Sequence, residues 1–166
     1  MRYIVHILLP DIRSAYNVGS IFRSADCFGV QKIYLASTTP RPTDRFGRST
    51  SGPQKEIAKT ALGGEKTIAW EYSEKAQDVI KKAKKEGFIV VAVEQSESSI
   101  SIAACKKILA KEKHTNVLCV FGNEVEGVSK DILKLCDHTI EIPMKGDKES
   151  MNVSVCAGVV MYEFLK

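Results

Sequence analysis

Short, uninterrupted apolar runs alternate along this chain with stretches of helical periodicity, and this alternation restricts the possible folds more than any other feature. The run at residues 88–93, Phe-Ile-Val-Val-Ala-Val, has the length of a buried strand and is far shorter than the ~20 residues that cross a membrane. Apolar runs without polar alternation are typical of parallel strands that are covered on both faces. The sequence therefore predicts an α/β protein with a mainly parallel sheet and helices on both faces.

The expected elements follow one another from one end of the chain to the other. Strands are predicted at residues 3–9, 32–36, 67–70, 88–93, 117–121 and 139–142. Helices are predicted at residues 18–28, 74–86, 130–135 and 153–165, with Asn17 and Ser129 as caps. No repeat or linker interrupts the pattern, and 166 residues is the length of one ordinary domain. We therefore expect a single domain over residues 1–166.

The cysteine and histidine content argues against several classes of protein. Five cysteines are an odd number, they are widely spaced, and they include no Cys-x-x-Cys pair. This pattern fits neither a disulfide framework nor a zinc ribbon. The three histidines have no metal-ligand spacing, and the N-terminal residues lack an apolar signal segment. We expect a cytoplasmic protein with free thiols, no bound metal and no membrane association.

The net charge of +4 is unevenly distributed. Residues 1–55 contain eight basic and three acidic residues, and all six arginines lie within the first 48 positions. The planar guanidinium fork suits phosphate recognition. The polar stretch at residues 41–55 is expected to be a loop that contacts an RNA backbone; the alternatives are an acidic protein partner or simple solvation. The candidate RNA-binding residues are Arg13, Arg41, Arg45, Arg48 and Lys55.

Three polar turns are candidate ligand sites, because ligands of parallel sheets bind beyond the carboxyl ends of the strands. The first, residues 17–25, places Asn17 and Arg23 on the polar side of a helix, where Arg23 is either an anion contact or an ordinary exposed side chain. The second, residues 121–127, is glycine-rich but is neither a Rossmann fingerprint nor a P-loop. Its two carboxylates, without a basic residue, favour a neutral or cationic ligand over a phosphate.

The third turn, at residues 142–152, joins a strand to the final helix. It begins at Pro143, and the helix opens at Ser150 or Asn152. This helix is apolar around most of its circumference, which predicts burial against two surfaces. The second surface is either a second subunit or a crowded core.

Together the three turns resemble the SpoU (TrmH) family of RNA ribose 2′-O-methyltransferases, within the SPOUT superfamily. The motifs occur in the family's order: Asn17-x-Gly19-x-x-x-Arg23-Ser-Ala25, Gly122-x-Glu124-x-x-Gly127, and Ile142-Pro143-Met144 with Ser150-Met151-Asn152-Val153-Ser154. Ser24 replaces the common threonine and Met151 the common leucine, and neither change affects the chemistry. The resemblance covers nearly the whole chain, and we expect no extra N-terminal RNA-binding domain of the kind that many relatives carry.

The resemblance implies a C-terminal deep trefoil knot, a homodimer with composite active sites, and S-adenosylmethionine as the cofactor. The residues implied to bind the cofactor are Val93, Glu94, Gly122, Gly127, Ile142, Met144 and Met151. The residues implied to be catalytic are Arg23, Asn17, Glu124, Ser150 and Asn152.

The implied reaction is methylation of a ribose 2′-hydroxyl in structured RNA, with tRNA favoured over rRNA because compact relatives include tRNA enzymes. In the family Arg23 is the proposed base. A guanidinium stays protonated at neutral pH, so anchoring an RNA phosphate is the physically easier role for Arg23. The alternatives are an RNA-binding protein of the same fold that has lost catalysis, and a small-molecule α/β enzyme that binds a nucleotide.

Overall fold

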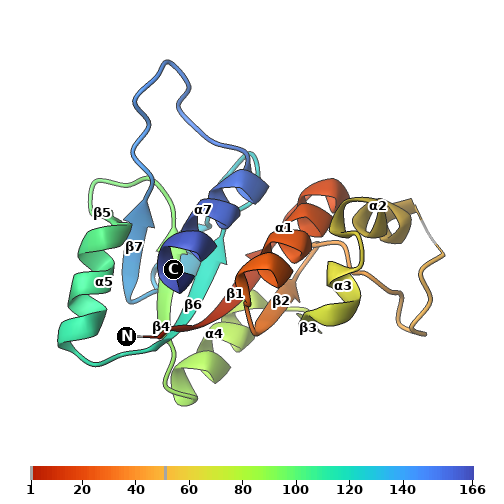
Figure 1. Ribbon diagram of the computed structural model, residues 1–166, viewed down its shortest axis with the longest axis horizontal. Helices are drawn as coiled ribbons and strands as arrows, with labels where there is room; N and C mark the ends of the chain where they lie inside the picture. Colours follow the sequence, from red (N-terminus) through yellow and green to blue (C-terminus); the bar gives the residue numbers. More distant parts are fainter. Residues whose placement is uncertain (1, 51) are drawn as a thin grey trace.

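Seven strands form a central sheet in the computed structural model, which describes residues 2–50 and 52–166 (Figure 1). Their order is β3-β2-β1-β6-β4-β7-β5, and each pairing between neighbours is parallel. The prediction of a mainly parallel α/β sheet is confirmed. The strands are β1 (Ile4–Pro10), β2 (Lys32–Ala36), β3 (Ala69–Ser73), β4 (Ile89–Val93), β5 (Ile100–Ser101), β6 (Asn116–Phe121) and β7 (His138–Glu141).

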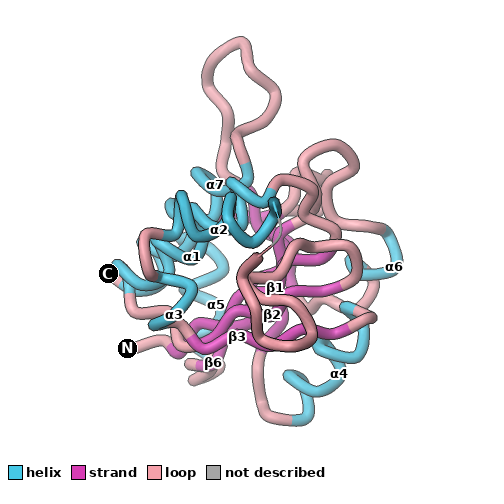
Figure 2. The backbone as a smooth tube through the Cα atoms, turned by 90° about the vertical axis from the view of Figure 1, so that its right-hand side faces the viewer, coloured by secondary structure: helices cyan, strands magenta, loops and turns pink. Residues whose placement is uncertain are grey.

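Helices cover both faces of the sheet, and Figure 2 shows the two layers on either side of the strands. Helices α1, α2, α3, α5 and α7 lie on one face, while α4 and α6 lie on the other. The helices are α1 (Ala15–Phe28), α2 (Gly52–Ala61), α3 (Gly64–Thr67), α4 (Ala76–Lys85), α5 (Ile102–Lys111), α6 (Lys130–Leu133) and α7 (Val153–Leu165). Among the described residues, no helix has the length and apolar character that a membrane span requires.

The central strands are buried on both sides, as their continuous apolar sequences predict. In β1, Ile7 and Leu9 belong to the core under α1 and α7, whereas Leu8 between them belongs to the core under α4. All three side chains are fully buried. Burial of a side chain of this size contributes about 1.5–3 kcal/mol. The middle of the sheet is therefore a rigid base for the loops at its carboxyl edge.

Helix α1 begins earlier than its pattern predicts. Its N-cap is Ser14, whose hydroxyl accepts a hydrogen bond from the backbone N–H of Asn17. The prediction that Asn17 caps the helix is therefore wrong. A serine one turn earlier fills that role, which leaves the Asn17 side chain available for other contacts.

Three helices, α2, α3 and α5, and the short strand β5 lie where the sequence predicts no such element. Helix α2 begins at Gly52, inside the stretch expected to be a loop, so Lys55 lies on a helix; Ser51 lies outside the described residues. Ile57 is buried against α1, and a Cβ at Gly19 would come within 2.4 Å of the Ile57 carbonyl oxygen. Glycine at position 19 thus allows the close approach of α1 and α2. This contact orders a segment whose composition alone is typical of a loop.

Candidate active site

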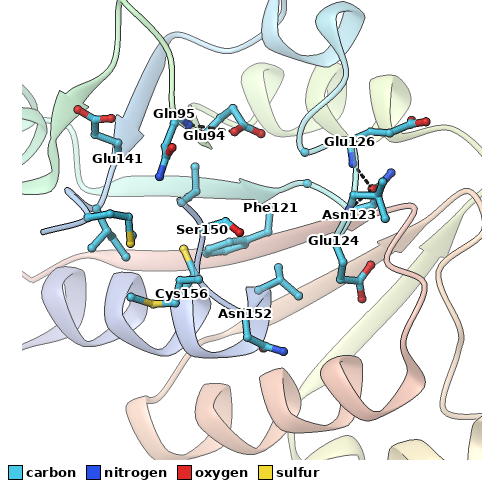
Figure 3. Close-up of a pocket in the computed structure, with 18 residues that line it drawn as sticks. Glu94, Gln95, Phe121, Asn123, Glu124, Glu126, Glu141, Ser150, Asn152 and Cys156 are labelled. Atoms are coloured by element: carbon cyan, nitrogen blue, oxygen red, sulfur yellow. Dashed lines mark hydrogen bonds between the residues drawn. The ribbon is translucent and has the colours of Figure 1, made fainter. Parts of the chain in front are cut away.

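A cavity of about 440 Å³ lies at the carboxyl edge of the sheet, beyond β4, β6 and β7 (Figure 3). This volume is in the range of small-molecule sites. The lining contains four glutamates and, among the described residues, no lysine, arginine or histidine. The glutamates are Glu94, Glu124, Glu126 and Glu141. The surroundings therefore favour a cationic ligand over a phosphate-bearing one.

The structure gathers most of the predicted site residues around this cavity. All seven residues expected to bind the cofactor line it: Val93, Glu94, Gly122, Gly127, Ile142, Met144 and Met151. Of the expected catalytic residues, Glu124, Ser150 and Asn152 also line it. Asn17 lies outside the lining and is joined to it by hydrogen bonds. Arg23 is exposed on α1 and is outside the described lining.

Glu124 ties the loop after β6 to the start of α1. Its carboxylate accepts hydrogen bonds from the backbone N–H groups of Arg13 (3.0 Å) and Ser14 (3.1 Å) and from Asn17 Nδ2 (2.9 Å). Partial burial raises the pKa of Glu124, but these hydrogen bonds outweigh it and leave the pKa below its ordinary value. The carboxylate is thus an ionised anchor whose acceptor positions are largely filled, which does not suit a general base.

Two asparagines extend this connection to α7. Asn152 Nδ2 donates to Asn17 Oδ1 at 3.2 Å, while Asn152 Oδ1 accepts from the backbone N–H and the hydroxyl of Ser154. Asn152 is thereby the N-cap of α7, which decides between the two predicted candidates, Ser150 and Asn152. Figure 3 shows Glu124 and Asn152 on the side of the cavity nearest α1. The polar edge of the cavity is therefore built by three segments that are far apart in the sequence.

Glu94 and Gln95 connect the other loops of the cavity. Glu94 Oε2 accepts from the backbone N–H of Val128 at 2.7 Å, and Gln95 Nε2 donates to the carbonyl oxygen of Glu149 at 3.0 Å. The loop after β4 therefore holds both the loop after β6 and the loop after β7. Gly127 has φ +68°, and a Cβ there would lie 2.1 Å from Glu94 Oε2, so this turn requires glycine.

Several cavity residues are absent from the predicted site residues, among them Gln95, Asn123, Glu141 and Cys156, although Asn123 lies in the candidate turn at residues 121–127. The first three follow or end strands at the carboxyl edge, which is the signal that would have located them. Cys156 lies one turn into α7, in a stretch that indicates only an apolar helix. Burial raises the pKa of the Cys156 thiol to about 11, with a further contribution from the Glu94 charge. At neutral pH this thiol is therefore an uncharged part of the wall.

The candidate RNA-binding residues are not part of the cavity lining. Arg13 is part of the turn before α1, and its backbone N–H donates to the Glu124 carboxylate. The Arg41 guanidinium lies over the Tyr72 ring, 4.3 Å from its centroid. Three further candidates have exposed side chains on the loop after β2 and on α2: Arg45, Arg48 and Lys55.

Residues 4–162 match the model of the family described as the SpoU rRNA Methylase family. The chain belongs to this family. Among curated members, it is 28% identical over 160 residues to the tRNA (guanosine(18)-2'-O)-methyltransferase of Aquifex aeolicus and 27% identical over 157 residues to the 23S rRNA (guanosine-2'-O-)-methyltransferase RlmB of Neisseria meningitidis. Each match covers 95% of this SpoU chain, which spans 66% and 56% of the two relatives.

Solved SpoU structures share the fold. An AdoMet-bound rRNA methyltransferase from Sinorhizobium meliloti superposes with a TM-score of 0.81 at 23% identity, covering 99% of this chain and 56% of that one. The TrmH/SpoU tRNA modifying enzyme of A. aeolicus gives a TM-score of 0.77 at 25% identity, covering 99% and 75%. The sheet and the loops that build the cavity therefore belong to a SpoU domain.

Proposed function

We propose that this protein is an S-adenosylmethionine-dependent methyltransferase that modifies a ribose 2′-hydroxyl in structured RNA, with tRNA preferred over rRNA. The observation that carries the proposal is an acidic cavity whose edge is joined by hydrogen bonds to Asn17 and Asn152. Membership of the SpoU family and the activities for which the A. aeolicus and N. meningitidis relatives are named support it. The A. aeolicus protein, named as a tRNA enzyme, supports the preference for tRNA.

The cavity lining fits the cofactor. When bound, S-adenosylmethionine supplies an activated methyl group on a positively charged sulfur. The glutamates of the lining favour that charge, and the glycine turn exposes backbone groups to a ligand. The residues that would hold it are Val93, Glu94, Gly122, Gly127, Ile142, Met144 and Met151.

The polar residues of the edge have separate roles in the proposed reaction. Asn17 and Asn152 hold each other and orient the ribose, while Ser150 lies beside the incoming hydroxyl. Glu124 keeps this edge in place through the start of α1. Arg23 anchors an RNA phosphate, a role that suits a permanently charged guanidinium.

Two copies of the chain form the proposed enzyme. An apolar groove between α1 and α7 exposes Phe28, Val155 and Tyr162, and α7 buries its opposite side in the core. A second copy packed here would bring its Arg23 helix to the composite site. Mixing two inactive variants, Arg23→Ala and Asn152→Ala, is expected to restore part of the activity if Arg23 acts across the interface. If mixed dimers form but show no recovery of methyl transfer, Arg23 acts within its own subunit.

The proposal includes a C-terminal trefoil knot and action in the cytoplasm. The knot requires α7 to pass back through the loops around the cavity, and the bonds from Glu94 to Val128 and from Gln95 to Glu149 hold these loops together. The five cysteines are free thiols, which suits a reducing compartment.

The deciding experiment measures transfer of a labelled methyl group from S-adenosylmethionine to unmodified tRNA and rRNA, followed by mapping of the 2′-O-methyl site. We expect incorporation into tRNA and calorimetric binding of S-adenosylhomocysteine, with no binding of NAD or ATP. RNA binding without incorporation would favour the inactive RNA-binding alternative. Binding of NAD or ATP in place of S-adenosylhomocysteine would overturn the cofactor assignment.

A further inference from the structure

Phe46 is a large apolar side chain that the fold leaves in water. Its residue surface is 63% exposed, and it lies in the loop after β2 rather than in the groove between α1 and α7. Exposure at this level gives Phe46 little role in the stability of the core. A single exposed apolar residue is ordinary on a protein surface, so the case for a binding role rests on the turn and the charges around Phe46.

The turn that carries Phe46 is a built structure. Asp44 Oδ1 accepts from the backbone N–H groups of Phe46 (2.8 Å) and Arg48 (2.9 Å), and Asp44 Oδ2 accepts from the Arg48 guanidinium. The Asp44 backbone N–H also donates to the Arg48 carbonyl oxygen, and Gly47 supplies a φ of +75°. These bonds close the turn and hold the Phe46 ring at its tip.

Two guanidinium groups accompany the ring. The Arg45 and Arg48 Cζ atoms lie 4.8 and 4.9 Å from the Phe46 ring centroid. Because both guanidinium groups lie over the ring, a nucleobase would stack on a guanidinium plane or displace one from the ring face, and the positive charge would lie beside the phosphates. An acidic peptide would pair with the two guanidinium groups, but the aromatic ring would add little to its affinity.

The loop that carries the cluster starts at the same edge of the sheet as the cavity. This loop leaves the carboxyl end of β2, and β1 separates β2 from β6, which ends at the cavity. Two strand spacings correspond to about 10 Å. This spacing applies to the strand ends; Phe46 lies ten residues beyond Ala36, the last residue of β2, so an RNA bound at Asn17 would have to continue past β1 to meet Phe46.

We propose that Phe46 is a stacking platform for an unpaired nucleobase of the RNA substrate, with Arg45 and Arg48 contacting the adjacent phosphates. The inference rests on the proposed function for the identity of the ligand as RNA. Stacking on Phe46 would tolerate any base sequence, because every base has a π face. A base in a continuous duplex is already stacked on its neighbours, so the platform selects unpaired nucleotides.

The test compares the binding of two RNAs to the full chain by fluorescence anisotropy: a hairpin with an unpaired loop and a blunt duplex with the same stem sequence. Phe46→Ala is expected to weaken hairpin binding by about 5- to 150-fold, the range for one stacked base. Duplex binding should change less than about twofold, because there no base is free to stack. Leu62→Ala is the matched control, since Leu62 is 66% exposed at the end of α2 and lies outside the arginine loop.

A second variant tests the stack directly. Phe46→Trp should bind the hairpin with the affinity of the parent chain, and the hairpin should quench the fluorescence of the new tryptophan. The parent chain, which has a single tryptophan, gives the background signal. Equal hairpin affinities of the parent and Phe46→Ala, or equal losses for hairpin and duplex, would overturn the inference. The binding assay does not depend on methyl transfer, so the two proposals can fail separately. If the protein transfers no methyl group but Phe46→Ala weakens hairpin binding, only the proposed activity is refuted. If the protein is active but Phe46→Ala leaves hairpin binding unchanged, only the stacking platform is refuted.

Discussion

The Glu94 carboxylate accepts a hydrogen bond from the backbone N–H of Val128 at 2.7 Å, across 34 positions of the chain. The bond joins the exit of β4 to the far end of the loop that follows β6. Val128 is buried, so its N–H has little access to water. The two loops that enclose most of the cavity are therefore held together by Glu94.

Replacement of Glu94 separates this positioning role from a direct effect of its charge. Glu94→Ala leaves the buried Val128 N–H without its acceptor, which costs about 1–3 kcal/mol. We expect the affinity for S-adenosylhomocysteine, measured by calorimetry, to fall about tenfold. Glu94→Gln keeps an acceptor oxygen and should stay within about threefold of the parent. Equal losses in both variants would show that the charge acts on the ligand itself.

Substitutions at Gly127 and at Gly146 together test whether the turn at Gly127 requires glycine, with Gly146 as the control. Gly127 combines φ +68° with a Cβ position 2.1 Å from the Glu94 carboxylate, whereas a Cβ at Gly146 would meet nothing within 4 Å. Gly127→Ala should displace the Glu94 side chain and reduce cofactor binding at least tenfold, with about 1–3 kcal/mol lost in stability. Gly146→Ala should change neither. Calorimetry and thermal unfolding check both, and normal binding by Gly127→Ala would contradict the geometry.

Arg23 lies apart from the cavity, and this separation predicts how its variant behaves. Arg23→Ala should lower methyl transfer about 100-fold or more, since it would remove the proposed charged anchor of the RNA. Cofactor affinity should remain nearly unchanged, because Arg23 is outside the described lining. Single-turnover methylation and calorimetry measure the two effects. Arg2→Ala, at an exposed arginine before β1, is the control, and normal turnover by Arg23→Ala would remove Arg23 from the mechanism.

The sheet could be predicted from the sequence because each central strand is a continuous apolar run with few alternatives. The prediction failed where a contact, rather than composition, decides the structure. Helix α2 has a polar sequence with Pro53 in its first turn, and it is ordered by the packing of Ile57 beside Gly19. Helix α5 buries Ile102, Cys105 and Leu109 at helical spacing, but lysines between them weaken the pattern.

The candidate site could be predicted from its glycine, asparagine and acidic residues, but the bonds within it could not. The sequence alone does not reveal that Glu124 holds the start of α1 or that Asn17 meets Asn152, which is 135 positions away. Such contacts depend on the strand order, which places β6 between β1 and β4. Motif spacing carries no information about that order.

His6 predicts a dependence of stability on pH that is independent of the cavity. Burial, and then the Lys32 charge, lower the His6 pKa from 6.5 to about 4, and the ring stacks on Phe88 with centroids 4.4 Å apart. Because the unfolded chain binds this proton more readily, stability should fall as the pH drops from 6.5 towards 4. Because the His6 side chain is partly exposed, the expected effect is reduced: the free energy of unfolding should fall by about 1 kcal/mol, or the Tm by about 2–4 °C, between pH 7.5 and 5. Thermal unfolding of the parent and His6→Phe checks this, and an equal slope in both chains would assign the effect to other groups.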